Sequence, residues 1–411
     1  MMNKEIFEKI KELVARVECD SPFYREKFKS AGITAKSLKE FSDFEKIPFS
    51  DKAELRVAYP LGLMSVPRSE VVRIHSSSGT TGSPVIIPYT KKDVEDWTAM
   101  FARCYETAGV TCDDVVQVTP GYGLWTAGIG FQAGAERVGA MVVPMGPGNT
   151  DKQLQMMTDL ESTVFCSTSS YALLIAEEVQ KRGLRDRIKL KKGIIGSERW
   201  GDLMRGRIES ELGIELFDIY GLTEVYGPGI AIDCPCHCGM HYWDDYLYFE
   251  IIDSDGMVLP HGETGELVIT TLCKEGAPLV RYRTHDLTRI IPSKCKCGSV
   301  YPMIDRIVGR TDDMIKVKGV NIYPANIDTL LKDVDGASSE YQIIIDHKNG
   351  RDTVLLKVEK KDGADKNTVE RTVCELFKKR IGIAIEVDAL CIGEIPRSEK
   401  KSRRVFDYRE C

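Results

Sequence analysis

The sequence predicts an α/β fold followed by a smaller α+β unit at the C-terminal end. Between Val71 and Gly256, short β-rich runs alternate with helix-length polar or amphipathic stretches, a rhythm typical of α/β proteins with largely parallel sheets. After Gly256 the chain turns to closely spaced strands and turns, and a smaller mixed unit follows about Arg310. At ~100–200 residues per domain, a length of 411 residues predicts about two to four domains.

The first 70 residues are expected to be mainly helical and to form an entry layer on the larger body. Pro48, Pro60 and Pro67 separate the helical segments. The N-terminus lacks the apolar core of a signal peptide and instead predicts a docked amphipathic helix. The apolar residues at helical spacing are Ile6, Phe7, Ile10, Leu13, Val14 and Val17.

The elements that follow are predicted from β-branched runs and from amphipathic stretches. No internal repeat or low-complexity linker interrupts them. The expected strands are 71–74, 85–88, 114–118, 140–145, 163–168, 193–197, 214–220, 265–272, 279–283 and 314–319. The expected helices are 91–109, 151–161 and 367–380, and a hairpin is expected around 347–352.

Composition excludes several classes of function. With 56 Lys and Arg against 62 Asp and Glu, the net charge of −6 argues against a nucleic-acid-binding surface and favours a small-molecule partner. No window reaches the ~18 consecutive apolar residues of a membrane helix. The 13 cysteines, in a chain with no export signal, predict a cytoplasmic protein whose thiols stay reduced or bind metal.

A loop rich in serine, threonine and glycine, HSSSGTTGSPVII at 75–87, lies between two β-branched runs. Such a loop presents many backbone N–H groups and hydroxyls to one point, as a polyphosphate requires; a flexible surface turn is the alternative. The chain contains no GxxxxGK(S/T) and no GxGxxG motif, and this loop joins strand to strand. The sequence therefore supports neither a Walker-type nor a Rossmann-type nucleotide site.

Two further segments carry carboxylates that could serve a nucleotide. In DIYGLTEVYGPG, Thr223 and Glu224 should follow the end of a strand, where α/β proteins bind ligands and a carboxylate can hold Mg²⁺. An ordinary loop with a capping Thr and Glu is the alternative. In RYRTHDLTRII, Asp286 is expected on a charged turn between strands, suited to accept hydrogen bonds from two ribose hydroxyls. The alternative pairs Asp286 with Arg281, Arg283 or Arg289.

Two cysteine clusters predict a structural zinc site. DCPCHCGMH at 233–241 supplies thiols and imidazoles, and KCKCG supplies two more thiols further along the chain. The two clusters offer more side chains than the four ligands that a tetrahedral zinc binds, so several ligand sets are possible. The alternative is that these cysteines are reduced surface thiols that bind no metal. The candidate ligands are Cys234, Cys236, His237, Cys238, His241, Cys295 and Cys297.

Five motifs occur in the order found in the adenylate-forming enzymes: SSSGTTGSP, YGLTE, YRTHD, VGRTDDMIKVKGVNIYP and PRSEKKSRRV. The segments around them, including GYGLWTAG, GAERVGA and GMHYWDDYLYFEIID, closely resemble the phenylacetate-CoA ligase family. The resemblance runs from about Tyr24 to Asp407. It implies a large, multi-subdomain adenylate-forming N-terminal domain at 1–309 and a smaller, mobile α+β lid at 310–411.

The resemblance implies an AMP-forming ligase that joins an aryl acid, phenylacetate or a close relative, to coenzyme A. The acid attacks the α-phosphorus of ATP, an acyl-adenylate and pyrophosphate form, and the CoA thiol then displaces AMP. ATP, magnesium, CoA and a structural zinc are implied, and a homodimer is allowed. The alternative is a member of the same family that transfers AMP to a deazaflavin coenzyme or another acceptor without making a thioester.

The resemblance also assigns roles to residues. Lys401 falls at the catalytic lysine, although Lys400 stands where the family usually has glycine. Thr223 would contact the α-phosphate, and Glu224 would bind magnesium. The phosphates would be wrapped by Ser76, Ser77, Ser78, Gly79, Thr80, Thr81 and Gly82. The adenine would be contacted by Ser197, Glu198 and Tyr220, with the adjoining Gly221. The ribose would be held by Asp286 and Arg310, and Asp312 would lie at the hinge.

Two more assignments follow from the same resemblance. Tyr122 and Trp125 fall where the family builds its acyl pocket, and aromatic walls suit a flat aryl acid; the alternative is that both rings belong to the core. The aligned zinc ligands are Cys234, His241, Cys295 and Cys297, with Cys236 or Cys238 as substitutes. The other histidines, His75, His261, His285 and His347, are expected to be structural or at the surface.

Overall fold

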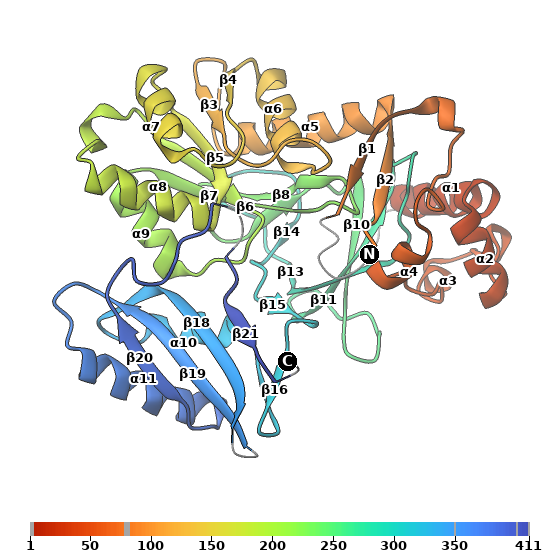
Figure 1. Cartoon of the computed structure of the whole chain (residues 1–411). Helices are drawn as coiled ribbons and strands as arrows, with labels where there is room; N and C mark the ends of the chain where they lie inside the picture. The colour runs from red at the N-terminus through yellow and green to blue at the C-terminus, as the bar shows by residue number, and fades with distance from the viewer. Residues whose placement is uncertain (1–3, 78–82, 349–350, 400–401, 410–411) are drawn as a thin grey trace. The chain divides into compact units, whose positions relative to one another are not determined.

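The computed structural model describes residues 4–77, 83–348, 351–399 and 402–409. The chain packs as two compact units: unit 1 is Met1–Gly146 with Phe217–Ile307, and unit 2 is Pro147–Leu216 with Val308–Cys411. Figure 1 labels their helices and strands. The expected boundary at 309/310 separates a large domain from a lid that moves during catalysis. The division into two compact units does not test such a movement, so this boundary stays a prediction.

Unit 1 begins with the expected helical layer. Ile10, Leu13, Val14 and Val17 form the buried face of the first helix, as their spacing predicted. The second helix starts after Ser21, whose hydroxyl accepts a backbone N–H, and ends at a left-handed Gly32 with φ 66°. The helices are α1 (Lys4–Asp20), α2 (Pro22–Ala31), α3 (Phe41–Phe44) and α4 (Lys52–Val57), with 3-10 turns at Ala35–Ser37 and Arg68–Glu70.

A hairpin of antiparallel β1 (Val71–Ser76) and β2 (Ile86–Thr90) leads into helix α5 (Lys91–Thr107). After it come β3 (Val115–Val118), α6 (Ala127–Val138) and β4 (Met141–Pro144), and β3 and β4 are parallel. Two glycines of α6 allow it to approach α5. A Cβ at Gly130 would lie 2.5 Å from the Trp97 ring, and one at Gly134 would lie 2.7 Å from Phe101.

The second stretch of unit 1 is built from strands. A run in the order β7, β8, β9, β14 and β13 pairs antiparallel, and β10, β11 and β12 form an antiparallel meander. Short connections join β7 to β8 and β8 to β9, which makes these pairs antiparallel. The sheets are therefore mixed, whereas the sequence predicted largely parallel sheets. The strands are β7 (Glu215–Leu222), β8 (Gly227–Asp233), β9 (Met240–Tyr242), β10 (Leu247–Ile252), β11 (Gly265–Thr271), β12 (Tyr282–Thr288), β13 (Ile290–Ile291) and β14 (Met303–Ile304).

Unit 2 begins with an α/β stretch that matches the predicted alternation. Strands β5 and β6 are parallel because helix α8 returns the chain between them. The elements are α7 (Thr150–Asp159), β5 (Val164–Thr168), α8 (Ser169–Lys181), a 3-10 turn at Arg185–Arg187, β6 (Lys192–Gly196) and α9 (Asp202–Leu212).

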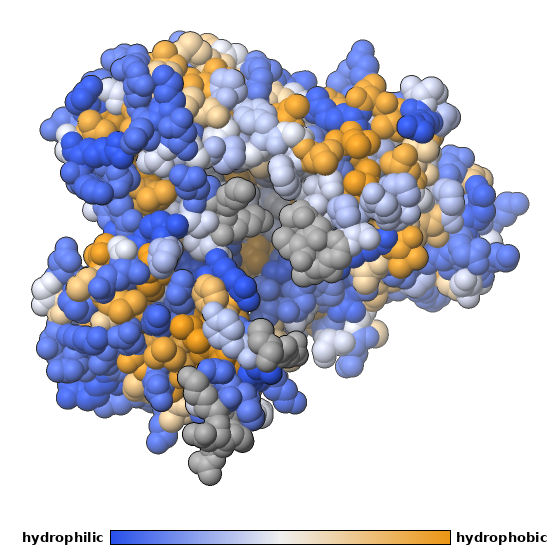
Figure 2. Space-filling view, viewed as in Figure 1, coloured by the Kyte–Doolittle hydropathy of each residue, from blue (hydrophilic) through white to orange (hydrophobic). Residues whose placement is uncertain are grey.

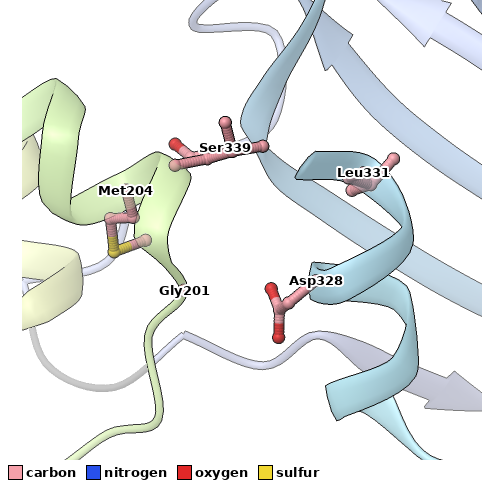
Figure 3. Close-up of a pocket in the computed structure, with 6 residues that line it drawn as sticks. Gly201, Met204, Asp328, Leu331 and Ser339 are labelled. Atoms are coloured by element: carbon pink, nitrogen blue, oxygen red, sulfur yellow. The ribbon is translucent and has the colours of Figure 1, made fainter. Parts of the chain in front are cut away.

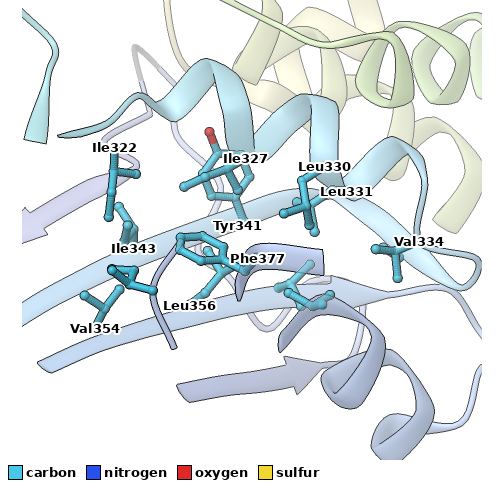
Figure 4. Close-up of a cluster of buried hydrophobic side chains, with 14 of the residues drawn as sticks. Ile322, Ile327, Leu330, Leu331, Val334, Tyr341, Ile343, Val354, Leu356 and Phe377 are labelled. Atoms are coloured by element: carbon cyan, nitrogen blue, oxygen red, sulfur yellow. The ribbon is translucent and has the colours of Figure 1, made fainter. Parts of the chain in front are cut away.

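The C-terminal stretch of unit 2 is the predicted α+β arrangement. Its four-stranded sheet has the order β20-β19-β18-β21, and helices α10 and α11 contribute to one buried core with it (Figure 4). Ile327 and Leu330 of α10 meet Tyr341 and Phe377 in that core. The elements are β15 (Gly309–Arg310), β16 (Ile315–Val317), β17 (Val320–Ile322), α10 (Pro324–Lys332), β18 (Ala337–Lys348), β19 (Arg351–Lys360), α11 (Lys366–Ile381), β20 (Glu386–Leu390) and β21 (Val405–Asp407).

The surface carries apolar side chains on the β1–β2 hairpin, where Figure 2 shows them gathered. Val72 and Ile74 point outward from β1, with 61% and 43% of their surface exposed. None of the helices that the structure describes is long and apolar enough to cross a membrane.

Candidate functional site

The structure describes only the two ends of the serine-rich loop. Ser76 ends β1, and both it and Ser77 are buried. The Ser77 N–H donates to the Val85 carbonyl at 3.0 Å, and its hydroxyl accepts from the Val85 N–H at 3.0 Å. The loop therefore joins two antiparallel strands, as predicted. The predicted phosphate-binding residues Ser78, Gly79, Thr80, Thr81 and Gly82 lie outside the described residues.

Thr223 and Glu224 lie in a tight turn directly after β7, at the predicted strand end. The Glu224 side chain is buried, and its Oε1 lies 2.9 Å from Nζ of Lys52, the first residue of α4. Lys52 is partly exposed, with 38% of its side chain accessible. A buried carboxylate beside a partly exposed ammonium can exchange that cation for a metal ion, so the turn fits a magnesium ligand.

Asp286 does not lie on a turn, so that expectation is wrong. It is a buried residue inside β12, whose side chains alternate between buried and half-buried. The alternation was hidden because the inward positions of this strand are polar, namely Thr284, Asp286 and Thr288. The Tyr220 hydroxyl donates to Asp286 Oδ2 at 2.6 Å, which brings two predicted nucleotide-binding residues of unit 1 together.

The arginines near Asp286 pair elsewhere. Arg281 forms a buried ion pair with Glu250, Arg283 pairs with Glu266, and Arg289 pairs with Asp305. These three pairs account for the positive charges in the RYRTHDLTR segment. The alternative in which Asp286 is their structural partner is therefore not needed.

In unit 2, Ser197 follows β6 and turns the chain at φ 70°, a left-handed conformation that a non-glycine residue adopts only where its surroundings hold it. Glu198 Oε2 accepts the Ser170 hydroxyl and, at 3.3 Å, the Ser402 N–H. Ser402 directly follows Lys401. Within unit 2, the segment that carries the predicted catalytic lysine is thus tied to the predicted adenine-binding turn; Lys400 and Lys401 themselves lie outside the described residues.

Arg310, in β15, binds a carboxylate through one edge of its guanidinium. Its Nε and Nη2 donate to Asp312 Oδ1 and Oδ2 at 2.8 and 2.9 Å. The predicted ribose-binding arginine and the predicted hinge aspartate therefore form a bidentate pair, which fixes the direction of the guanidinium.

Tyr122 and Trp125 lie in the connection between β3 and α6. Trp125 is 55% exposed and Tyr122 is half-buried, so the alternative in which both rings belong to the core is wrong. The Tyr122 ring packs on Gly128, where a Cβ would lie 2.8 Å from a ring carbon. Small residues thus make room for this ring, and an accessible aromatic surface remains beside it.

The cysteine clusters come together in unit 1. The ligand atoms of Cys234, His241, Cys295 and Cys297 all lie within 4.8 Å of one another, which is the aligned ligand set. Cys234 Sγ and Cys295 Sγ are 3.6 Å apart. With Zn–S bonds of ~2.3 Å, the sulfur atoms of a tetrahedral site lie about 3.8 Å apart, so the donor set fits zinc.

The groups around the four ligands also suit a metal. His241 Nδ1 lies 2.9 Å from the Tyr301 carbonyl, which leaves Nε2 facing Cys297 Sγ at 3.2 Å. Partial burial acts to raise the pKa of Cys295, but hydrogen bonds from the Cys297 backbone and from neighbouring side chains lower it to about 6. Cys238 Sγ is 3.5 Å from Cys295 Sγ, so Cys238 remains an alternative ligand.

A small pocket lies where α9, α10 and the start of β18 meet within unit 2 (Figure 3). Its carboxylate, Asp328, is already paired with Arg199. The pocket therefore offers a ligand little free charge, and none of the predicted site residues lines it. Its lining residues are Gly201, Leu203, Met204, Asp328, Leu331 and Ser339.

Sequence reasoning missed two lysines at the Thr223–Glu224 turn. Lys52 lies far from Glu224 in sequence, and no local pattern marks it. Lys274 donates to the Glu224 carbonyl at 3.4 Å, and burial lowers its pKa to about 7 although Asp93 and Glu224 raise it. No local pattern marks Lys274 either, since Glu275 and Gly276 separate it from the apolar run APLV.

Known proteins resemble this chain over nearly its whole length. Residues 17–273 match the family described as AMP-binding enzyme, and residues 319–409 match the AMP-binding enzyme C-terminal domain. The phenylacetate-coenzyme A ligase of Escherichia coli strain K12 is 41% identical over 398 residues, which cover 94% of this chain and 90% of the relative. That of Thermus thermophilus is 37% identical over 425 residues, which cover 98% and 96%.

A solved structure is also similar. The 2-hydroxyisobutyryl-CoA ligase in its postadenylation state, in complex with R3-HIB-AMP, superposes with a TM-score of 0.89 at 28% identity, covering 99% of this chain and 90% of that one.

Proposed function

We propose that the acid substrate of this enzyme is phenylacetate or a close aryl-acid relative. The chain belongs to the phenylacetate-CoA ligase family of AMP-binding enzymes. It is an ATP-dependent, AMP-forming acid–CoA ligase. The observation that carries the proposal is the 37–41% identity to phenylacetate-CoA ligases over 94–98% of this chain. The accessible rings of Tyr122 and Trp125 support it, because aromatic walls suit a flat acid.

We propose that the nucleotide is bound through the residues that the family motifs mark. Asp286, oriented by the Tyr220 hydroxyl, would accept the ribose hydroxyls, together with the guanidinium of Arg310. Ser197 and Glu198, with Tyr220 and Gly221, would contact the adenine. The loop from Ser76 to Gly82 would surround the phosphates with backbone N–H groups.

Adenylation requires groups that stabilise charge where it grows. A carboxylate is a poor electrophile, so the acid attacks the α-phosphorus, pyrophosphate leaves, and negative charge increases on the α-phosphoryl oxygens. Thr223 and Lys401 would donate hydrogen bonds to those oxygens. The thiol of CoA would then attack the acyl carbon and release AMP.

The metals are part of the proposal. Glu224 would hold Mg²⁺, which when bound supplies positive charge to the phosphates during adenylation. Lys52 would release the carboxylate to that ion, and its position beside Glu224 Oε1 supports this role. Zinc would be held by Cys234, His241, Cys295 and Cys297 and would be structural, because four protein ligands leave no open position for a substrate.

The cellular setting is also proposed. We propose a cytoplasmic protein whose cysteine thiols stay reduced or bind zinc. The family resemblance allows a homodimer, and light scattering of the purified protein measures the oligomeric state directly.

One assay tests the function. The enzyme is incubated with ATP, Mg²⁺ and CoA and with one acid at a time: phenylacetate, benzoate, indoleacetate or 2-hydroxyisobutyrate. AMP and acyl-CoA are then measured. We expect both products in equal amounts, with the highest kcat/KM for phenylacetate or another aryl acid. One methylene in an apolar pocket changes discrimination by only ~1–3 kcal/mol, so the ranking among aryl acids must be measured.

Other outcomes of that assay would change the proposal. A preference for 2-hydroxyisobutyrate would place the substrate with the structural relative and overturn the aryl-acid assignment. AMP without any thioester would instead favour transfer of AMP to another acceptor. As a control of the pocket assignment, Trp125→Ala should raise the KM for the aryl acid without changing the KM for ATP.

A further inference from the structure

Lys274 is a buried lysine that the proposed mechanism leaves without a role. It lies in the connection that follows β11 in unit 1, and its side chain is 0% exposed. In the part of the chain that the structure describes, no carboxylate forms an ion pair with it. Its ammonium instead donates to two successive backbone carbonyls, that of Glu224 at 3.4 Å and that of Val225.

Two aromatic rings complete the surroundings of this ammonium. Nζ of Lys274 lies 4.7 Å from the ring centre of Tyr89 and 4.7 Å from that of Tyr226. The Tyr89 hydroxyl donates to the Tyr226 carbonyl at 2.8 Å. Three consecutive carbonyls, from Glu224 to Tyr226, are therefore held by donors from other parts of unit 1.

The backbone that presents Lys274 is itself fixed on both sides. The Arg16 guanidinium, from α1, donates to the Lys274 carbonyl at 2.6 Å and to the Glu275 carbonyl at 3.4 Å. The buried carboxylate of Asp93, from α5, accepts the N–H groups of Glu275 and Gly276 at 2.7 and 2.8 Å. The ammonium thus projects from a rigid base toward the turn.

Net stability does not explain this lysine. Burial lowers the pKa of the Lys274 ammonium although the Asp93 and Glu224 carboxylates act to raise it, so burying this charge is unfavourable compared with burying an apolar side chain of similar shape. A methionine would fill the space between the two rings without that cost, but it could not donate to the carbonyls. The contribution of Lys274 is therefore to the geometry of the turn.

We propose that Lys274 is a positioning residue which, with the Tyr89 hydroxyl, holds the carbonyls of Glu224–Tyr226 and so aims the Thr223 hydroxyl and the Glu224 carboxylate at Mg²⁺ and ATP. This inference rests on the proposed magnesium role of Glu224. Lys52 contacts the carboxylate end of Glu224, whereas Lys274 contacts its backbone, so the two lysines act at different points.

The test compares Lys274→Met with the wild-type full-length enzyme. We expect the melting temperature to stay the same or rise, because the variant removes a buried charge. We expect the half-saturating Mg²⁺ concentration and the KM for ATP in adenylation to rise at least threefold and the adenylation rate to fall at least tenfold. Hydrogen–deuterium exchange of the metal-free protein should become faster at the amides of 222–226. Lys91→Met, at an exposed position of α5, is the matched control and should change none of these values.

Two results would overturn the inference. One is unchanged Mg²⁺ and ATP dependence together with unchanged exchange at the turn. The other is a fall in melting temperature with a proportional loss of activity and an unchanged Mg²⁺ dependence, which would make Lys274 merely structural.

Two further variants keep the inference separate from the function on which it rests. Tyr89→Phe keeps the ring and removes one donor, so it should fold normally and show changes in the same direction that are smaller than those of Lys274→Met. No change at all would contradict a role of the Tyr89 hydroxyl in holding the turn. Glu224→Gln tests the magnesium role alone. If Glu224→Gln raises the half-saturating Mg²⁺ concentration and Lys274→Met does not, the inference fails while the proposed function stands. If Glu224→Gln leaves it unchanged, the magnesium role itself is wrong.

Discussion

At the scale of single residues, the site depends on polar groups whose partners lie far away in sequence. Asp286 is oriented by Tyr220, and Glu224 lies beside Lys52. Glu198 accepts the backbone N–H of Ser402, next to Lys401. Each contact sets the direction of a side chain, and direction is what adenylation requires, because the protein mainly positions the reactants and stabilises charge.

The first prediction concerns Lys401, which we propose as the catalytic lysine. Lys401→Ala should slow acyl-adenylate formation by about a hundred- to thousandfold, because a lost transition-state donor costs ~3–4 kcal/mol. Conversion of supplied acyl-adenylate and CoA to thioester should persist, since that step does not use the lysine. Lys400→Ala should change either step by less than about tenfold, or ~1.4 kcal/mol. Separate assays of the two half-reactions decide which of the two lysines is catalytic. If Lys400→Ala loses adenylation, the catalytic role belongs to Lys400 and not to Lys401.

At the scale of elements, close packing of α5 on α6 places the connection that carries Tyr122 and Trp125. The approach depends on two glycines, because a Cβ at Gly130 would meet the Trp97 ring and a Cβ at Gly134 would meet Phe101. The Phe101 side chain is fully buried and cannot move aside. The helix pair is therefore sensitive to a single methyl group.

The second prediction concerns this helix pair. Gly134→Ala puts a Cβ 2.7 Å from Phe101 and should destabilise the protein by about 1–3 kcal/mol, the usual cost of overpacking. Gly206→Ala in α9, where no atom lies within 4 Å of the added Cβ, is the control and should stabilise by about 0.4–1 kcal/mol. Urea unfolding of the two variants measures the difference; equal stabilities would show that α6 can shift.

The third prediction concerns the zinc ion that we propose at Cys234, His241, Cys295 and Cys297 of unit 1. The purified protein should contain about one zinc per chain, and Cys295→Ser should lower the melting temperature more than it lowers catalysis, because a structural metal contributes to folding. Cys19→Ser, at an exposed cysteine of α1, should change neither. Elemental analysis that finds no metal in protein purified without chelators would end the claim.

At the scale of the whole molecule, unit 2 combines residues from two separate stretches of the chain. Arg397 links them, since its guanidinium pairs with Glu177 of α8 and with the buried Glu359 of β19. Glu177 also pairs with Arg207 of α9. Arg397 lies four residues before Lys401 in sequence, so this network fixes the start of the segment that carries the proposed catalytic lysine.

The fourth prediction concerns this network. Glu177→Gln should lower the free energy of unfolding by about 1.5–3 kcal/mol, because it removes charged partners of Arg397 and Arg207. It should also slow adenylation more than thioester formation, since Lys401 follows the loosened segment. Glu178→Gln, the neighbouring surface residue of α8, should cost at most ~1 kcal/mol and leave both half-reactions unchanged. Equal effects of the two substitutions in urea unfolding and in the half-reaction assays would contradict the prediction.

The linear sequence was enough to predict most elements and the family. Periodicity located α1 and α5, and β-branched runs located β3 to β7, because these signals arise from local burial on one face of a helix or strand. Ordered motifs identified the ligase family because each motif is a short continuous segment. The position of Thr223 and Glu224 after a strand also followed from local pattern alone.

Tertiary packing was needed wherever a property depends on residues distant in the chain. Local pattern placed Asp286 on a turn, but the residue lies in β12, which pairs with β11 and whose polar positions are buried. Residue chemistry alone left seven candidate zinc ligands, and the family resemblance pointed to four of them; that these four lie together depends on the fold, because the pairing of β9 with β14 brings His241 near Cys295 and Cys297. Lys52 and Lys274 carry no local signal, since a lysine acquires a partner or a buried site only when separate segments pack together.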